Sequence, residues 1–193
     1  AIPEYHKLFS GNVIALGRMK GVGTLTEQQA KNYAITGPSG RASGFHCDVR
    51  KTHPYSLYNE VEFDEVVMEN GDSYDRYMVR MKEMEQSIKI LRQCCDMMDK
   101  EGHQGEFCAK VPKIIKLPKG HWYQQVEASR GAFGVYLESD GEGKPFQHPY
   151  RIHFQSPCFN LVGVVDLTCK NNLIADLITI TASLDYVIPD IDR

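Results

Sequence analysis

The chain has 193 residues, of which 42% are hydrophobic and 24% charged, and its formal net charge is −3 at pH 7. A chain of this length can bury roughly 70% of its unfolded surface in one domain, and its composition is typical of a soluble globular protein. The small negative charge and the lack of a Lys/Arg-rich run argue against nucleic acid as a partner, and no stretch approaches the ~20 consecutive apolar residues that span a bilayer.

The N-terminus begins Ala1-Ile2-Pro3, with neither an initiator Met nor a signal peptide. We therefore expect the chain to derive from a longer polypeptide. We also expect any contact with a membrane to be made through partner proteins.

The first regular element is predicted at Thr26, since Thr26-Glu27-Gln28-Gln29 fits a capping box that opens a short helix ending before Gly37. The segment 37–44, Gly-Pro-Ser-Gly-Arg-Ala-Ser-Gly, is rich in Gly, Ser and Pro, which predicts a loop over 37–55. It is not a P-loop, because a P-loop needs Gly-Lys-Ser/Thr at the start of a helix.

A long helix is predicted from Asp72, a suitable N-cap, to Gly102, a suitable C-terminal stop. Apolar residues spaced three and four apart form one stripe along it: Tyr74, Tyr77, Met81, Met84, Ile88, Leu91, Cys95 and Met98. Such a stripe indicates core packing, with an adaptable partner surface as the alternative. Arg76 and Arg80 share a face beside the stripe and are expected to be solvated.

Period-two alternation follows after Lys110. Phe133, Val135 and Leu137 define one strand, Tyr150, Ile152 and Phe154 define a second, and the segment 122–127 supplies a third antiparallel strand. Asp-Gly-Glu-Gly at 140–143 predicts the hairpin loop between the first two.

The C-terminal part carries no clear pattern over 159–169, whereas 173–182 is apolar on nearly all sides and predicts a buried helix that delivers the tail into the interior. The predicted fold is therefore α+β, mainly helical, with a long amphipathic helix and a small antiparallel sheet packed against the helices. We expect a single domain over 1–193, with a helical part over 1–102, the sheet over 103–158, and the buried helix and tail over 159–193.

The cysteines and histidines do not indicate a metal site. Six cysteines occur without a Cys-x-x-Cys pair, which is typical of reduced and mostly buried thiols. The adjacent Cys94 and Cys95 are interpreted as core packing, with a redox pair as the alternative. The seven histidines form no His-x-x-x-His or His-Glu-x-x-His pair.

The last eleven residues, Ser183 to Arg193, resemble the C-terminus of the [NiFe]-hydrogenase large-subunit superfamily. In metal-binding members this tail is roughly Ser-x-Asp-Pro-Cys-x-x-Cys, and its two thiolates hold the active-site ions. Here the cysteine positions fall on Val187 and Asp190, while the acid is kept as Asp185. Valine cannot ligate a metal, and one carboxylate is a poor replacement for two soft thiolates. The resemblance therefore implies a site without metal.

Three further segments resemble the quinone-reducing relatives of hydrogenase: 37–44 with 48–55, 71–77 with Arg80, Glu83, Met84 and Ser87, and 127–136, which is similar to a Glu-Ala-Pro-Arg/Lys-Gly strand. Over nearly its whole length the sequence is similar to the family of the 49-kDa subunit of complex I, which is the D subunit of bacterial NADH-quinone oxidoreductase. It covers the C-terminal half of that protein. It departs from the family at Ser129, usually Pro, at Ala132, usually Glu, and in a short region between Lys100 and His121.

The resemblance implies that the former metal cavity is part of a quinone-binding chamber. Asp185 is the candidate catalytic residue, because an ionisable group beside quinone can supply charge and protons; the alternative is a helix-end acid paired with backbone or Arg. Val187 and Ile188 would form apolar wall. Arg130 would approach the same cavity, or pair with an acid inside the fold, and Arg193 would anchor the tail.

The resemblance also implies a respiratory electron-transport translocase that uses ubiquinone or another quinone. Electrons would come from an iron–sulfur cluster on the adjacent subunit, with flavin and NADH on other subunits, and this chain would bind no cofactor. The family's quinone-head ligands, a His and a Tyr, belong to the other half, so the chain alone is expected to be inactive.

The expected partners are other subunits of the complex I peripheral arm, especially the adjacent iron–sulfur subunit. The expected location is peripheral, on the cytoplasmic face of the bacterial inner membrane or the matrix side in mitochondria. The alternatives are a membrane-bound [NiFe]-hydrogenase-type catalytic subunit and a non-catalytic assembly scaffold.

Overall fold

The computed structural model describes residues 2–101, 108, 110–111, 117–141 and 149–192. In chain order its elements are α1 (Ile2–Tyr5), the π-helical η1 (His6–Ser10), α2 (Val13–Met19), α3 (Glu27–Asn32), α4 (Gly37–Ala42), α5 (Val49–Thr52), α6 (Ser73–Glu101), β1 (Gly120–Ala128), β2 (Gly131–Ser139), β3 (Arg151–Gln155), α7 (Pro157–Gly163), α8 (Val165–Cys169), α9 (Asp176–Leu184) and α10 (Ile188–Ile191). The predicted α+β class is confirmed.

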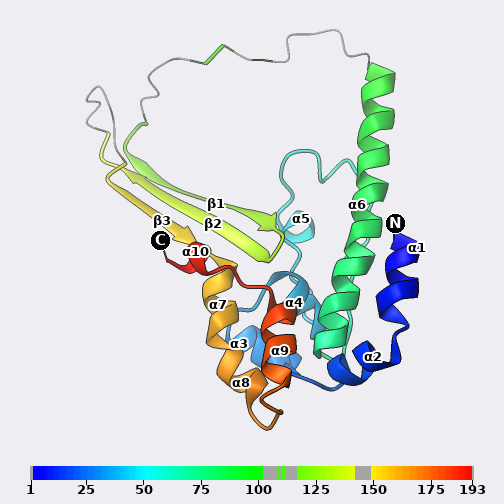
Figure 1. Cartoon of the computed structure of the whole chain (residues 1–193). Helices are drawn as coiled ribbons and strands as arrows, with labels where there is room; N and C mark the ends of the chain where they lie inside the picture. The colour runs from blue at the N-terminus through cyan, green and yellow to red at the C-terminus, as the bar shows by residue number, and fades with distance from the viewer. Residues whose placement is uncertain (1, 102–107, 109, 112–116, 142–148, 193) are drawn as a thin grey trace.

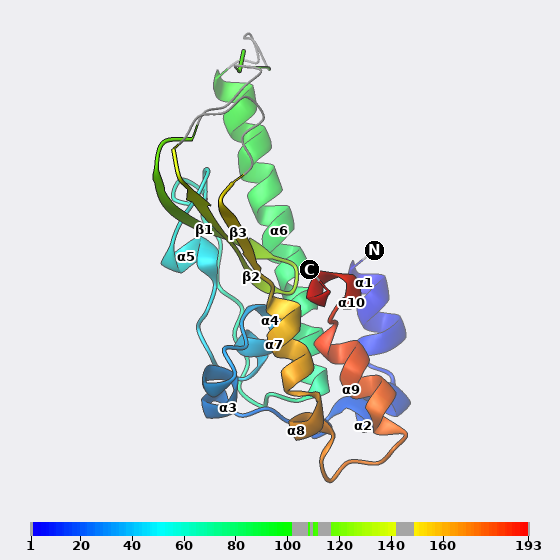
Figure 2. The same cartoon turned by 90° about the vertical axis from the view of Figure 1, so that its left-hand side faces the viewer.

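The elements form a cluster of short helices from which one long helix and one sheet project (Figure 1). α6 rises along one side of the cluster and packs against α4 and α9 near its first turns. The turned view in Figure 2 shows α7, α8 and α9 gathered below the sheet. The core lies within the cluster and consists of Leu25, Ala30, Ile35, Leu161, Val164, Ile180 and Leu184.

Both predicted helix starts are confirmed. The Thr26 hydroxyl accepts a hydrogen bond from Gln29 N, and the Gln29 side chain accepts one from Thr26 N, which completes the capping box of α3. Asp72 caps α6 by accepting from Asp75 N at 2.8 Å, and its other oxygen accepts from Gly21 N. The predicted stop of this helix, Gly102, lies outside the described residues.

The prediction of a loop over 37–55 is wrong in two places, since α4 and α5 lie within it. Gly37 adopts a φ of +67°, which starts α4 without a Cβ penalty, and Pro38 then occupies the first turn. All residues of α4 are buried. Small residues let this short helix fit between α6 and β2, so tertiary packing overrides the local preference for a turn.

The expected core packing of the α6 stripe holds only near the start of the helix. Met81 is buried, whereas Met84, Ile88, Leu91 and Met98 are exposed, with 63% of Leu91 accessible. The described chain covers a neighbouring face of this half of α6 instead: Gln93 and Gln86 accept hydrogen bonds from Glu62 N and Asp64 N. An apolar stripe predicts a contact face, but it does not specify whether the same chain covers it.

The three predicted strands form an antiparallel sheet in the order β1-β2-β3. The sheet meets the helices at the end that carries the β1–β2 turn, where β1 contacts α5 and β2 contacts α4 and α7. The rest leans away from the cluster, and β3 is exposed along its length. The predicted hairpin loop lies outside the described residues at positions 142 and 143.

The C-terminal segment also differs from expectation. α7 and α8 occupy 157–169, where the sequence shows no clear pattern. The prediction of a helix buried on all sides is wrong for α9, because it buries Ile180 and Leu184 but leaves Ile178 77% exposed. Within the described residues, no helix is both long enough and apolar enough to cross a membrane.

Candidate functional site

The candidate site is built around Asp185, the residue that ends α9. Asp185 adopts a left-handed conformation, with φ 56° and ψ 43°, and its N–H donates to Thr181 O at 3.1 Å. Aspartate tolerates this conformation better than most residues. The reversal turns the tail away from α9. The Asp185 side chain is 41% exposed in this chain.

Arg130 pairs with Asp185 from the turn between β1 and β2. Its Nε donates to Asp185 O at 3.1 Å, and its Nη2 donates to Asp185 Oδ1 at 3.2 Å. The structure thus brings together two of the predicted site residues, 55 positions apart. It also shows Asp185 as a helix-end acid paired with an arginine, the alternative considered from the sequence.

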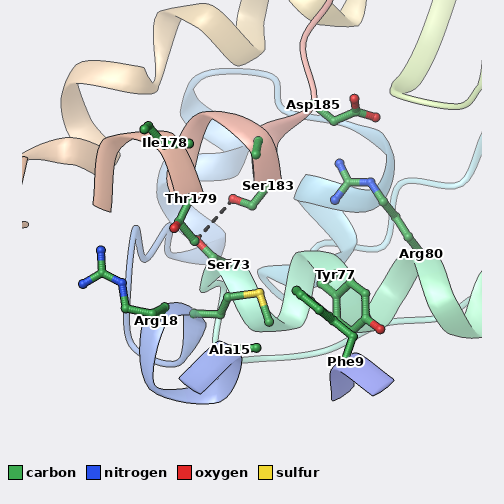
Figure 3. Close-up of a pocket in the computed structure, with 12 residues that line it drawn as sticks. Phe9, Ala15, Arg18, Ser73, Tyr77, Arg80, Ile178, Thr179, Ser183 and Asp185 are labelled. Carbon is green, nitrogen blue, oxygen red and sulfur yellow. Dashed lines mark hydrogen bonds between the residues drawn. The ribbon is translucent and has the colours of Figure 1, made fainter. Parts of the chain in front are cut away.

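Arg80 is a third member of the site that the sequence interpretation missed. Its Nη1 donates to Arg76 O at 2.9 Å, and within the described residues its buried Nε has no hydrogen-bond partner. Burial lowers the pKa of Arg80; the charges of Asp185 and Glu83 act against this without reversing it. Figure 3 shows the guanidinium directed toward Asp185.

The predicted solvation of Arg76 and Arg80 is therefore wrong, most clearly for Arg76, which is fully buried. Arg76 Nε donates to Ser183 Oγ at 2.9 Å, and its Nη1 and Nη2 donate to Gly71 O and Gly23 O, both at 2.8 Å. Burial lowers the pKa of Arg76 to about 10, so it keeps its charge at neutral pH. The bond to Ser183 ties α6 to the last turn of α9, two residues before Asp185.

Two cavities meet at Asp185 and Arg80. The apolar cavity, about 490 Å³ in volume, lies between α2, α6 and α9 (Figure 3); its lining consists of Phe9, Ala15, Arg18, Met19, Ser73, Tyr77, Arg80, Ile178, Thr179, Ala182, Ser183 and Asp185. The charged cavity, about 310 Å³, is lined by Arg41, Arg50, Arg80, Glu83, Met84, Ser87, Glu127, Ala128, Ser129 and Asp185. The apolar lining of one cavity and the ionisable groups of the other thus meet at the Asp185 carboxylate and the Arg80 guanidinium.

The charged cavity contains a buried ion cluster that the sequence interpretation also missed. Arg41 is 1% exposed and lies 2.6 Å from Glu83 and 2.8 Å from Glu127. Burial raises the pKa of Glu127, although Arg41 opposes this change. The segments 37–44 and 127–136 contain Arg41 and Glu127, but their spacing of 86 residues gave no local signal that they meet.

The remaining predicted site residues lie along the tail. Val187 lines a third, smaller cavity of about 220 Å³ together with Arg130 and Asp190. Val187 N donates to Cys158 Sγ at 3.4 Å. Ile188 is 61% exposed, and Arg193 lies outside the described residues. Roles for these three residues stay predictions.

Potential metal ligands do not gather in the described part of the chain, where no group of three or more His, Cys, Asp or Glu side chains could hold an ion. The expectation of mostly buried thiols is only partly met: Cys47 and Cys158 are buried, while Cys95 and Cys108 are exposed. The prediction that Cys95 packs inside the core is therefore wrong.

Comparisons with known proteins give one consistent result. The family described as respiratory-chain NADH dehydrogenase, 49 Kd subunit, matches residues 1–116 and 106–193. The chain is 49% identical over 192 residues to the fused C/D subunit of NADH-quinone oxidoreductase from Bacteroides fragilis. It is 47% identical over 193 residues to the D subunit of the Desulfotalea psychrophila enzyme and 43% identical over 188 residues to that of Bacillus mycoides.

These alignments cover 100%, 100% and 97% of this chain, but 35%, 50% and 50% of the respective relatives. The chain thus spans between about a third and half of the length of the curated relatives it matches.

Proposed function

The chain belongs to the family of the 49-kDa subunit of respiratory-chain NADH dehydrogenase, and on this premise we propose that it works within an NADH-quinone oxidoreductase, where Asp185, Arg80 and Arg130 border a quinone-binding chamber. The family assigned from the tail and the three internal segments is confirmed by the relatives, which are named as subunits of that oxidoreductase. Quinone as substrate, and the other subunits as partners, are proposals for this chain.

One observation carries the proposal: Asp185 and Arg80 lie where an apolar cavity meets a charged one. A quinone has a flat apolar ring and two carbonyl oxygens, so its site needs apolar walls and a few placed polar groups. The apolar cavity has the volume of a small-molecule site, and Tyr77 and Ile178 contribute wall to it. Arg80 lines both cavities, and its guanidinium carries N–H donors that suit a carbonyl oxygen.

Reduction of quinone to quinol adds two electrons and two protons, and each C=O becomes C–OH. Electrons would be supplied by an iron–sulfur cluster on the adjacent subunit, and NADH and flavin would be bound by other subunits. As a carboxylate, Asp185 would balance the charge of Arg80 and Arg130, and it would relay a proton to the reduced ring. Val187 and Ile188 would add apolar wall, and Arg193 would anchor the tail.

The proposal gives this chain no cofactor of its own and predicts that it neither oxidises NADH nor reduces quinone alone. Its place would be peripheral, in the arm of the complex that faces the cytoplasm, with membrane contact made by partner subunits.

The test is Asp185→Asn in the full complex. We expect reduction of a soluble quinone to fall about tenfold or more, with assembly intact and with NADH oxidation by an artificial acceptor unchanged. Asp166→Asn, which neutralises an exposed acid on α8, is the matched control and should change neither activity. Unchanged quinone turnover in the assembled Asp185→Asn complex would refute the proposal and favour a scaffold role.

A further inference from the structure

The Arg130–Asp185 pair is too exposed to fix its own geometry. About a third of the Arg130 side chain and 41% of the Asp185 side chain are accessible. Ion pairs with this exposure contribute roughly 0–1 kcal/mol, because solvent screens them and two side chains must be ordered. Something else must therefore hold the turn that carries Arg130.

That turn is short and rigidly placed in the sheet. Ser129 and Arg130 connect β1 to β2. The two cross-strand pairs next to this turn are Ala128 with Gly131 and Glu127 with Ala132. The second of these pairs, Glu127 with Ala132, is called here the anchor rung. A shift of the anchor rung would move Arg130 with it, since Arg130 lies only two positions before Ala132 in the chain.

Helix α4 contacts both residues of the anchor rung. At its N-terminal end, Thr36 Oγ1 accepts a hydrogen bond from Ala132 N at 2.9 Å. At its C-terminal end, Arg41 Nη1 donates to Glu127 Oε1 at 2.8 Å, while Glu127 Oε2 accepts from Val49 N at 3.1 Å. One short helix thus holds the rung at two points.

Arg41 also ties the anchor rung to the long helix. Its Nε donates to Glu83 Oε1 at 2.8 Å, and Glu83 lies on α6 one turn after Arg80. Burial lowers the pKa of Arg41, but Glu83 and Glu127 outweigh burial and the pKa is raised, so the cation is firmly kept. The N–H donors of a buried, charged guanidinium point in fixed directions, so Arg41 sets the positions of both carboxylates.

We propose that Thr36 and Arg41 are positioning residues, which hold the anchor rung against α4 and α6 so that Arg130 meets Asp185 at the junction of the two cavities. The inference rests on the proposed function for its effect on turnover. Its physical basis is that a misplacement of about 1 Å at a reacting site can lower the rate by about a hundredfold.

The first experiment uses Thr36→Val in the full NADH-quinone oxidoreductase, because valine keeps the shape and removes only the acceptor for Ala132 N. We expect quinone turnover to fall about tenfold, and Thr36→Ser to restore it. The matched control is Thr52→Val, which removes a hydroxyl from an exposed threonine that bonds Asp48 O. The inference is wrong if Thr36→Ser is as impaired as Thr36→Val, or if Thr36→Val is fully active while Asp185→Asn is impaired.

A double-mutant cycle separates positioning from general damage. In an Asp185→Asn background, Thr36→Val should cost less than about twofold, because Arg130, the residue that it positions, has already lost its carboxylate partner. The same fold-loss in both backgrounds would overturn the inference. Arg41→Lys, which keeps the charge but loses the fork, should show the same non-additivity if the complex assembles.

A structure of the Thr36→Val variant distinguishes this inference from the proposed function. We expect the Arg130 Nη2–Asp185 Oδ1 distance to exceed the 3.2 Å seen here and the pair to be broken. An unchanged pair overturns the positioning role whatever Asp185 does. A broken pair in a complex whose turnover is insensitive to Asp185→Asn supports positioning and refutes the proposed function.

Discussion

Gly37 and Gly131 pack backbone against backbone, so closely that a Cβ added to Gly37 would lie 2.4 Å from the Gly131 Cα atom. Both residues have positive φ, +67° and +137°. The contact joins the start of α4 to the start of β2, one residue before Ala132 of the anchor rung. Neither position can accept a side chain without separating the helix from the sheet.

Gly37→Ala should therefore destabilise the protein. Strain at positive φ and the clash with Gly131 together predict a loss of about 2–3 kcal/mol in the free energy of unfolding, measured by urea denaturation. Gly17→Ala is the control, because a Cβ at this exposed position on α2 meets nothing within 4 Å. It should leave stability unchanged or raise it by up to about 1 kcal/mol. Equal urea midpoints for the two variants would contradict this account.

Arg76→Lys tests the buried guanidinium. Arginine donates here to two carbonyl oxygens and two hydroxyl oxygens in different directions, and one ammonium group cannot reach them all. We expect the free energy of unfolding to fall by about 2–4 kcal/mol. Arg92→Lys, an exposed exchange on the same helix, should stay within about 0.5 kcal/mol. A similar small change for Arg76→Lys would show that the network contributes little.

Thiol labelling should distinguish buried from exposed cysteines. Burial raises the pKa of Cys47 to about 12, so the folded protein holds it as an unreactive thiol at about pH 8. Cys95 is exposed on α6. Mass spectrometry after brief alkylation should find Cys95 modified and Cys47 unmodified until urea unfolds the chain. Modification of Cys47 at the rate of Cys95 in the native state would be the contrary result.

Because the pKa of Cys47 is raised, the stability of the fold should fall as pH becomes alkaline. The folded pKa of Cys47 lies above the ordinary value of 9.0, so its contribution to stability is complete below about pH 9 and is lost as pH rises toward about 12. Cys47→Ser should flatten the decline in unfolding free energy between about pH 9 and 11. An unchanged slope would assign the decline to other groups.

The Asp48–Arg50 pair predicts that stability depends on pH in the opposite sense under acidic conditions. Burial raises the pKa of Asp48, but the hydrogen bond and charge of Arg50, 2.7 Å away, outweigh it and lower the pKa below 3.8. The stability that this pair contributes is present above the pKa of Asp48 in the unfolded chain. It is lost as pH falls through the pKa of Asp48 in the folded chain. Asp48→Asn should cost about 1–3 kcal/mol at pH 7, and the difference from wild type should narrow as pH falls below 3.8.

Asp64→Asn is the control for that experiment, because Asp64 is exposed and lies 3.7 Å from Lys89. It should change the unfolding free energy by less than about 0.5 kcal/mol at either pH. An Asp48→Asn effect that does not depend on pH would indicate lost capping of α5 rather than lost charge.

Features that depend on neighbours in sequence were predicted correctly. The capping box at Thr26, the N-cap at Asp72 and the three strands all rest on hydrogen bonds or alternation within a few residues. The C-terminal tail, with Val187 and Asp190 at cysteine positions, identified the family. These signals are local, so they can be recognised in the sequence without knowledge of the tertiary packing.

The pairings at the site were decided by tertiary structure alone. Arg130 and Asp185 are 55 residues apart, and Arg41 and Glu127 are 86 apart. A charged side chain is expected at the surface unless a partner offsets its desolvation, and the partner is invisible in the sequence when it comes from another element. For that reason Arg76 and Arg80 were predicted to be solvated, and the segment 37–44 was predicted to be a loop, although packing makes it the helix that holds the anchor rung.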